Sequence, residues 1–151
     1  MSKKIIVLAS LLLVLGGVLL WGCRNGYDAS QYIPEEIPVS DEGDRELKSI
    51  QRKIVDACRK KNFRPLEKYF DISRADREMA RYERKSDPVK EQLNLLGRYA
   101  QEVKDGNWQT FGLEKNPSVR ILRVMTADEN LLSIVLVKRK SGYLIRSVKL
   151  G

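Results

Sequence analysis

The sequence of 151 residues contains no histidine. Histidine is the commonest general base in enzymes and the commonest zinc ligand, so its absence excludes Ser–His and Cys–His nucleophiles and histidine-based metal sites. No other group of residues has the spacing of a catalytic, metal-binding or cofactor-binding motif. We therefore expect a protein that is not an enzyme and that holds no metal and no cofactor.

Cysteine is scarce, and the two cysteines have different surroundings. Cys23 ends an apolar run, whereas Cys58 falls on the apolar side of a predicted helix. With no histidine to activate its thiol, we expect Cys58 to be a small buried residue rather than a nucleophile. A domain of about 100 residues can bury enough apolar surface to fold without a disulfide.

The first 23 residues have the layout of a secretory signal. Lys3 and Lys4 precede an apolar run at 5–21, which is followed by Gly22 and Cys23. As a helix, this run would span only about 25 Å, less than the hydrocarbon core of about 30 Å. The pattern therefore favours a cleaved leader at 1–22 over a permanent membrane anchor. Both interpretations place the rest of the chain outside the cytoplasm.

The end of this leader resembles the lipobox of bacterial lipoproteins, in the sequence Leu20-Trp21-Gly22-Cys23. Trp21 departs from the pattern, where smaller side chains are usual. The resemblance implies that Cys23 receives a diacylglyceryl group, that the leader is cleaved before it, and that the new amino terminus is acylated, for instance by palmitate. Two or three acyl chains give durable attachment. We therefore expect a lipid-anchored protein of the cell membrane or outer membrane, and Arg24 implies the outer membrane in a Gram-negative host.

Charge is distributed unevenly after the leader. Residues 23–43 comprise the cysteine and a tether that contains Gly26, Pro34, Pro38 and Gly43 and is mostly acidic. Residues 44–151 carry 25 basic and 15 acidic residues, a net charge of +10. Such a surface attracts anionic partners, which outside the cytoplasm are an envelope protein or an anionic polymer rather than nucleic acid. The alternative is that the charge serves solubility alone.

Residues 44–151 are expected to form one α+β domain, with N-terminal helices packed on a C-terminal antiparallel sheet. Apolar residues recur at helical spacing in the first part and give way to β-branched runs in the last. The residues at 88–104 carry the longest apolar stripe and are expected to form the central helix. The predicted helices are 44–61, 72–85 and 88–104, with a kink at 62–70, and the predicted strands are 119–126, 131–138 and 143–150, with a possible fourth at 108–111.

The predicted helix at 72–85 carries a row of arginines on one face. Ile72, Ala75, Met79 and Tyr82 share the opposite, apolar face, which is expected to pack on the core. An arginine row of this kind could bind phosphates or an acidic partner. The alternative is an ordinary solvated face. The candidate binding residues are Arg74, Arg77, Arg81 and Arg84.

Two segments resemble small NTF2-like or cystatin-like lipoproteins of bacteria. They are the kinked segment Lys61–Phe70, with Asn62, Phe63 and Leu66, and the final hairpin Gly142–Val148. In that fold a curved antiparallel sheet wraps a helix, so the resemblance implies such a sheet and a concave pocket over residues 44–150. The sequence predicts only three or four strands, fewer than the full fold has.

Three functions remain open from the sequence. The first is a non-enzymatic binding or accessory module of the cell envelope. The second is an NTF2-like protein that binds a small ligand or catalyses a reaction, with Asp71, Asp76, Tyr69 and Tyr82 as the acid–base candidates. The third is an accessory lipoprotein of a secretion or envelope-assembly system. The charge and the missing catalytic motif favour the first.

Overall fold

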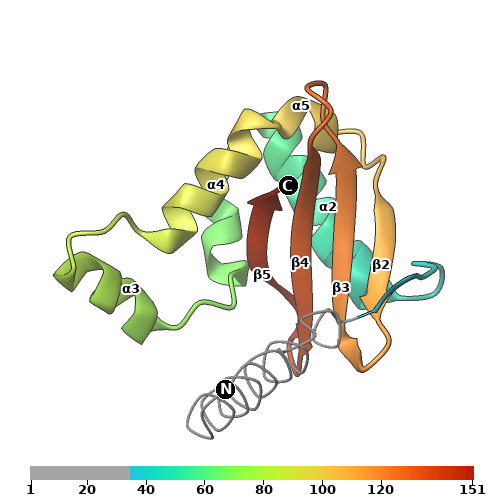
Figure 1. Cartoon of the computed structure of the whole chain (residues 1–151), viewed down its shortest axis with the longest axis horizontal. Helices are drawn as coiled ribbons and strands as arrows, with labels where there is room; N and C mark the ends of the chain where they lie inside the picture. Colours follow the sequence, from blue (N-terminus) through green and yellow to red (C-terminus); the bar gives the residue numbers. More distant parts are fainter. Residues whose placement is uncertain (1–34) are drawn as a thin grey trace, which may run out of the picture. The chain divides into compact units, whose positions relative to one another are not determined.

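The computed structural model describes residues 35–151, which form a five-stranded antiparallel sheet in the order β1-β2-β3-β4-β5 with helices on one face (Figure 1). This arrangement confirms the expected α+β combination of N-terminal helices and a C-terminal antiparallel sheet. The predicted leader and Cys23 lie outside the described residues. The elements are β1 (Glu36–Pro38), α2 (Arg45–Lys60), the 3₁₀ helix η2 (Arg64–Tyr69), α3 (Arg74–Tyr82), α4 (Pro88–Arg98), α5 (Ala100–Val103), β2 (Gln109–Leu113), β3 (Asn116–Met125), β4 (Leu131–Arg139) and β5 (Gly142–Leu150).

The last four strands form the predicted meander, with β2 as the fourth strand. β4 is hydrogen-bonded to β3 on one side and to β5 on the other, and it carries apolar residues on both faces. Leu122 on β3 lies opposite Ile134 on β4, which lies opposite Val148 on β5. Because side chains alternate along a strand, this row defines the inner face of the sheet, toward the helices.

The first strand corrects the expected boundary of the tether. β1 falls within the residues at 23–43 that were predicted to be a flexible spacer, and it pairs with β2, Glu36 opposite Leu113 and Pro38 opposite Phe111. An ion pair of 2.8 Å joins Glu36 to Arg123. A strand of three residues with a proline has no detectable sequence period, and proline is tolerated at a sheet edge. The folded unit therefore begins before Asp44.

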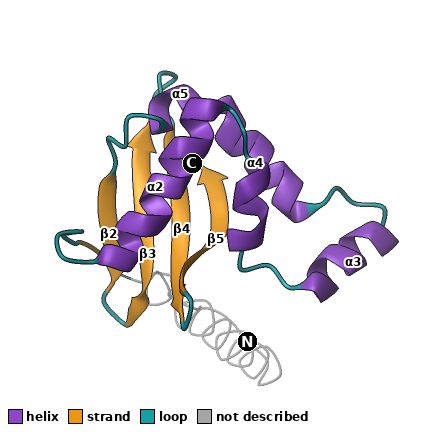
Figure 2. Ribbon diagram, turned by 180° about the vertical axis from the view of Figure 1, so that it is seen from behind, coloured by secondary structure: helices purple, strands orange, loops and turns teal. Residues whose placement is uncertain are grey.

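The helix α2 crosses the inner face of the sheet (Figure 2). The Asp44 carboxylate caps it by accepting a hydrogen bond from the backbone N–H of Leu47 at 3.0 Å. Lys61, in the left-handed conformation with φ of 50°, ends it. The predicted apolar stripe is entirely buried, which confirms this helix. Its members are Leu47, Ile50, Ile54, Ala57 and Cys58.

The residues expected to form one central helix at 88–104 form two helices instead. The chain breaks at Tyr99, whose φ of −107° is not helical, and α5 continues beyond it. The stripe residues are still buried, but α4 packs beside the edge strand β5 while α2 takes the central place. The Gln92 side chain accepts a hydrogen bond from the backbone N–H of Val148 at 2.7 Å. This bond satisfies a donor that the edge strand would otherwise leave unpaired.

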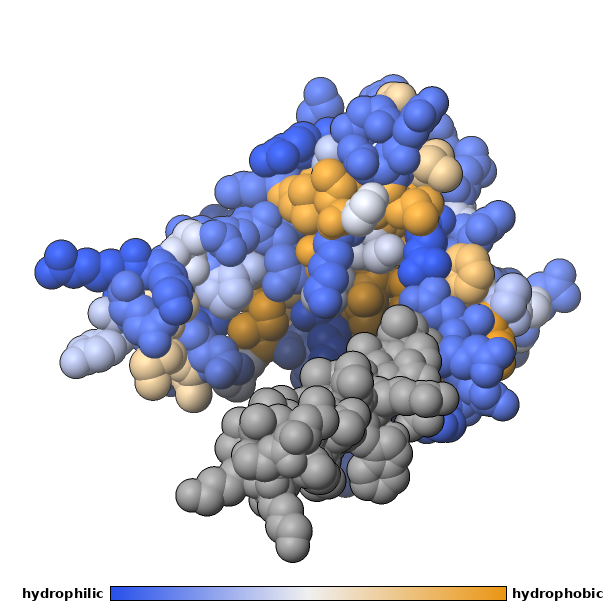
Figure 3. Space-filling model, in the orientation of Figure 1, coloured by the Kyte–Doolittle hydropathy of each residue, from blue (hydrophilic) through white to orange (hydrophobic). Residues whose placement is uncertain are grey.

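The outer face of the sheet is also apolar. Ile121 on β3 lies opposite Val135 on β4, and Val119 lies opposite Val137, all on the side away from the helices. Apolar side chains gather on this face in the space-filling view (Figure 3). The helix side holds the main core, whose buried residues all lie between Leu47 and Val148. We therefore expect residues 35–151 to fold without the first 34.

Truncation of a side chain to alanine should destabilise the domain much more on the inner side of β3 than on its outer side. Leu122 has no exposed surface, so Leu122→Ala should lower the free energy of unfolding of residues 35–151 by about 2–5 kcal/mol. Met125 is 63% exposed on the same strand, so Met125→Ala should change it by less than about 0.5 kcal/mol. Urea denaturation followed by circular dichroism measures both. Equal effects would contradict the assignment of the inner face.

Candidate functional site

The helix α3 projects away from the sheet (Figure 1) and buries none of its residues. Met79 is 57% exposed and Tyr82 is 86% exposed. Of the four residues predicted to share this apolar face, Ile72, just before the helix, packs against the core, whereas Ala75, Met79 and Tyr82 are exposed. Ser73 caps the helix by accepting a hydrogen bond from the N–H of Asp76, so local capping holds α3 together where tertiary packing does not.

The arginine row on α3 is partly neutralised by carboxylates. Arg74 pairs with Glu78 at 2.7 Å, and Arg77 pairs with Asp87 at 2.5 Å. Arg81 lines a hollow of about 360 Å³ with these two arginines. Arg84 lies beyond the end of the helix with φ of 56°, so the expected row of four loses its last member.

The contact between Arg77 and Asp87 joins α3 to the start of α4. The Asp87 carboxylate also accepts a hydrogen bond from the backbone N–H of Val89 at 3.0 Å and so caps α4. Hydrogen bonds from Arg77 are the main cause that lowers the pKa of Asp87. The geometry thus gives Arg77 a structural partner, which leaves it less available to an external anion.

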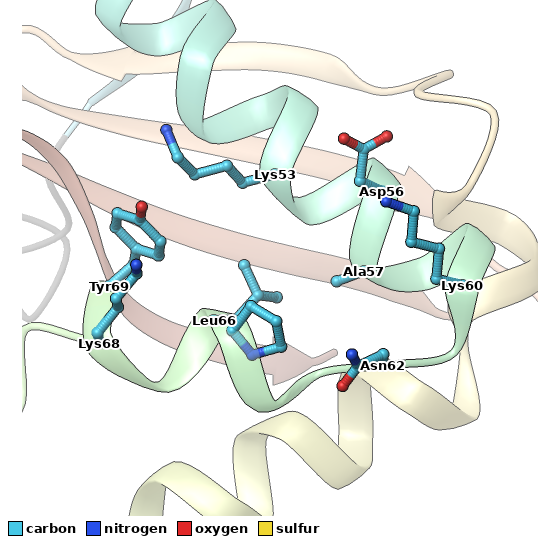
Figure 4. Close-up of a pocket in the computed structure, with 9 residues that line it drawn as sticks. Lys53, Asp56, Ala57, Lys60, Asn62, Leu66, Lys68 and Tyr69 are labelled. Carbon is cyan, nitrogen blue, oxygen red and sulfur yellow. The ribbon is translucent and has the colours of Figure 1, made fainter.

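A groove between α2 and η2 brings together residues that the sequence analysis did not group (Figure 4). It has a volume of about 270 Å³. Ala57 and Leu66 lie in its middle, with Lys53 and Tyr69 toward one end. The residues that line it are Lys53, Asp56, Ala57, Lys60, Asn62, Pro65, Leu66, Lys68 and Tyr69.

Two lysines of this groove flank one aromatic ring. The ammonium nitrogen of Lys53 lies 5.1 Å from the centroid of the Tyr69 ring, and that of Lys68 lies 5.2 Å from it. Both distances are within the range of cation–π attraction. Within residues 35–151, neither lysine forms an ion pair, and neither does Lys60. Their positive charges are therefore available to an anionic ligand.

The groove lies in a strongly basic stretch of the domain. Residues 52–68 contain seven basic and two acidic residues, and this excess is visible in the sequence. The sequence did not reveal the groove because the basic residues come from two helices. Only the turn at Lys61 and Asn62, where the N–H of Asn62 donates to the carbonyl of Ala57, brings η2 back along α2.

The four acid–base candidates of the alternative enzyme hypothesis lie apart. Asp71 pairs with Arg139 at 2.6 Å, and Asp76 accepts a hydrogen bond from Ser73 at the start of α3. Tyr82 is solvent-exposed on α3, whereas Tyr69 belongs to the groove. Residues 35–151 contain no cluster of three or more cysteine and carboxylate side chains that could bind a metal ion.

The thiol of Cys58 is buried on the inner side of α2. It is only 2% exposed, and burial raises its pKa from the ordinary value of 9.0 to about 12. A thiol with such a pKa is almost entirely protonated at neutral pH, and the thiolate is the reactive form. The geometry therefore supports a packing role for Cys58.

The Cys58 thiol of folded residues 35–151 should not react with a thiol-specific disulfide reagent at about pH 8, but should react fully in denaturant. The raised pKa also means that this thiol stabilises the fold most below pH 9 and that the contribution is lost as pH rises toward 12. Absorbance of the released chromophore measures the reaction. Rapid reaction of the folded unit would show that the thiol is accessible.

Asp87 should contribute to stability both as a cap and as a charge. Asp87→Ala should lower the free energy of unfolding by about 0.5–2 kcal/mol, and Asp87→Asn, which keeps a capping oxygen, should cost less. The lowered pKa gives stability that is present above about pH 4 and lost as pH falls through the folded-state pKa. Urea denaturation at pH 7 and pH 3 measures this, and a penalty for Asp87→Asn that persists undiminished at pH 3 would contradict the ionic contribution.

Within residues 35–151, no helix is long and apolar enough to span a bilayer. Comparisons with protein families, with curated proteins and with solved structures gave no significant match to the chain.

Proposed function

We propose that the chain is a bacterial lipoprotein, anchored through Cys23 to the cell membrane or outer membrane with its domain outside the cytoplasm. The observation that carries the proposal is the position of Leu20-Trp21-Gly22-Cys23 at the end of an apolar run that follows two lysines. In this view residues 1–22 are removed, and residues 24–35 form the tether between the lipid and β1. The domain acts as a binding or accessory module rather than as an enzyme.

The charge of the folded unit supports a binding role toward an anionic partner of the envelope, either a protein or a polymer. Two of the three arginines of α3 are paired with carboxylates, so the groove between α2 and η2 is the better candidate site. Its lysines have no carboxylate partner among residues 35–151. Attraction of an anion to such a site weakens with salt, because exposed charges are screened over about 8 Å at physiological ionic strength.

We also propose that the domain has the NTF2-like or cystatin-like type of fold. The order of one short strand, several helices and a four-stranded meander supports this, as does the helix that crosses the sheet. The space between that helix and the sheet is filled by core side chains, among them Leu122, Ile134 and Ile145. This filling disfavours the alternative of a small-ligand carrier or enzyme that uses an enclosed pocket there.

The anchor is tested by the mass and location of the natively expressed protein. The wild-type chain and Cys58→Ala should both lose residues 1–22, carry a lipid on Cys23 and fractionate with membranes. Cys23→Ser should keep Met1, because the modification that precedes cleavage needs the thiol. Intact-mass spectrometry of each fraction reads the outcome. Retention of Met1 with an unmodified Cys23 in the wild-type protein would overturn the anchored scheme.

A further inference from the structure

We propose that the groove between α2 and η2 binds an acidic peptide segment of a protein partner, with one apolar side chain on the floor and flanking carboxylates at the lysines. This inference deepens the proposed function by naming the partner's chemistry. It depends on the shape and charge of residues 53–69, so the folded unit at 35–151 is sufficient to test it.

The floor of the groove fits one apolar side chain. The apolar residues that line the groove are Ala57, Pro65, Leu66 and Tyr69, of which Leu66 is only 1% exposed. The volume of about 270 Å³ is slightly below the range of about 300–1,000 Å³ that is usual for sites of drug-sized ligands. A single leucine-sized or aromatic side chain matches this space, and the open shape lets the flanking backbone pass along the rim.

The rim supplies cations where the flanking residues of such a peptide would lie. Lys53 and Lys68 each place their ammonium nitrogen near the Tyr69 ring, and Lys60 lies about two helical turns along α2 from Lys53. Cation–π contacts restrict the two flanking lysines without neutralising them. Separate ammonium groups of this kind suit several dispersed carboxylates better than one compact anion.

Two further rim residues favour a peptide over a phosphate-bearing lipid or polymer. The Asp56 carboxylate can accept hydrogen bonds from peptide N–H groups, which a phosphate does not offer. The Asn62 side chain can donate and accept, as a peptide backbone requires. The groove also contains no arginine, the residue whose planar fork matches phosphate in two parallel hydrogen bonds. A chain with both donors and carboxylates therefore matches the whole rim.

Nuclear magnetic resonance of ¹⁵N-labelled residues 35–151 tests the proposal with four acetylated, amidated pentapeptides. Each has the sequence Glu-Glu-X-Glu-Glu, where X is Leu, Ile, Phe or Trp. At least one should cause saturable shifts of the amides of Ala57, Leu66 and Tyr69. The matched peptides with Gln in place of Glu, and the peptide with Gly at X, should bind at least about fivefold more weakly, as expected when about 1 kcal/mol is lost.

Charge-neutral variants locate the carboxylate contacts. Lys53→Gln and Lys68→Gln should each raise the dissociation constant about two- to fivefold, the range expected for exposed ion pairs. Lys115→Gln, which removes the same charge in the exposed turn between β2 and β3, should leave it within about 1.5-fold. Since all three positions are at least partly solvent-exposed, none of the variants should unfold the domain.

Several results would overturn the proposal. These are shifts that map away from the groove, equal binding of the Glu and Gln peptides, equal effects of the three lysine variants, or no shift with any of the four peptides. Shifts of the groove amides by phosphatidylglycerol vesicles but not by peptides would assign the site to a lipid surface instead. None of these outcomes depends on Cys23, so failure here is distinguishable from failure of the anchor, which is read by mass on the full chain.

Discussion

The domain depends on the contact between one side of α2 and the inner face of the sheet. Leu47, Ile50 and Ile54 are almost completely buried there, against strand residues such as Leu122 and Ile134. Burial of each such side chain contributes about 1.5–3 kcal/mol, more than any surface ion pair. The contact fixes the position of α2, against which α5 and η2 also pack. Within residues 35–151, Cys58 forms no disulfide, and no cluster of side chains could hold a metal ion.

The same contact determines the geometry of the candidate site. Because a helix turns by about 100° per residue, fixing Ile54 and Ala57 against the core turns Lys53 and Lys60 outward. The opposite wall, η2, is held to the core by Leu66, which is 1% exposed. The packed backbones of α2 and η2 therefore set the positions from which the groove lysines extend. The side chains of Lys60 and Lys68 are exposed, so binding of a ligand still has to order them, at a cost of about 0.5–1.5 kcal/mol for each side chain.

The sequence predicted correctly those helices and strands whose apolar residues recur at a regular helical or strand spacing and pack against another element of the core. This holds for α2 and for the three long strands. It was misleading for α3, because the spacing of Met79 and Tyr82 defines an apolar face but does not say whether another surface reaches it. It missed the three-residue β1 and the break at Tyr99, which depend on pairing and local backbone angles. The groove was missed because its lysines become neighbours only after the turn at Lys61.

The number of basic residues in a segment does not show how strongly the segment attracts an anion, because nearby carboxylates can compensate them. The arginines of α3 are conspicuous in the sequence, yet Arg74 and Arg77 are compensated by carboxylates, so their outward field is weak. Uncompensated lysines contribute attraction, but exposed ion pairs give only about 0–1 kcal/mol each and fade with salt. Burial of apolar groups, at about 0.8 kcal/mol per methylene, is not screened. A groove that joins an apolar floor to unpaired lysines can therefore select a partner that neither feature alone would distinguish.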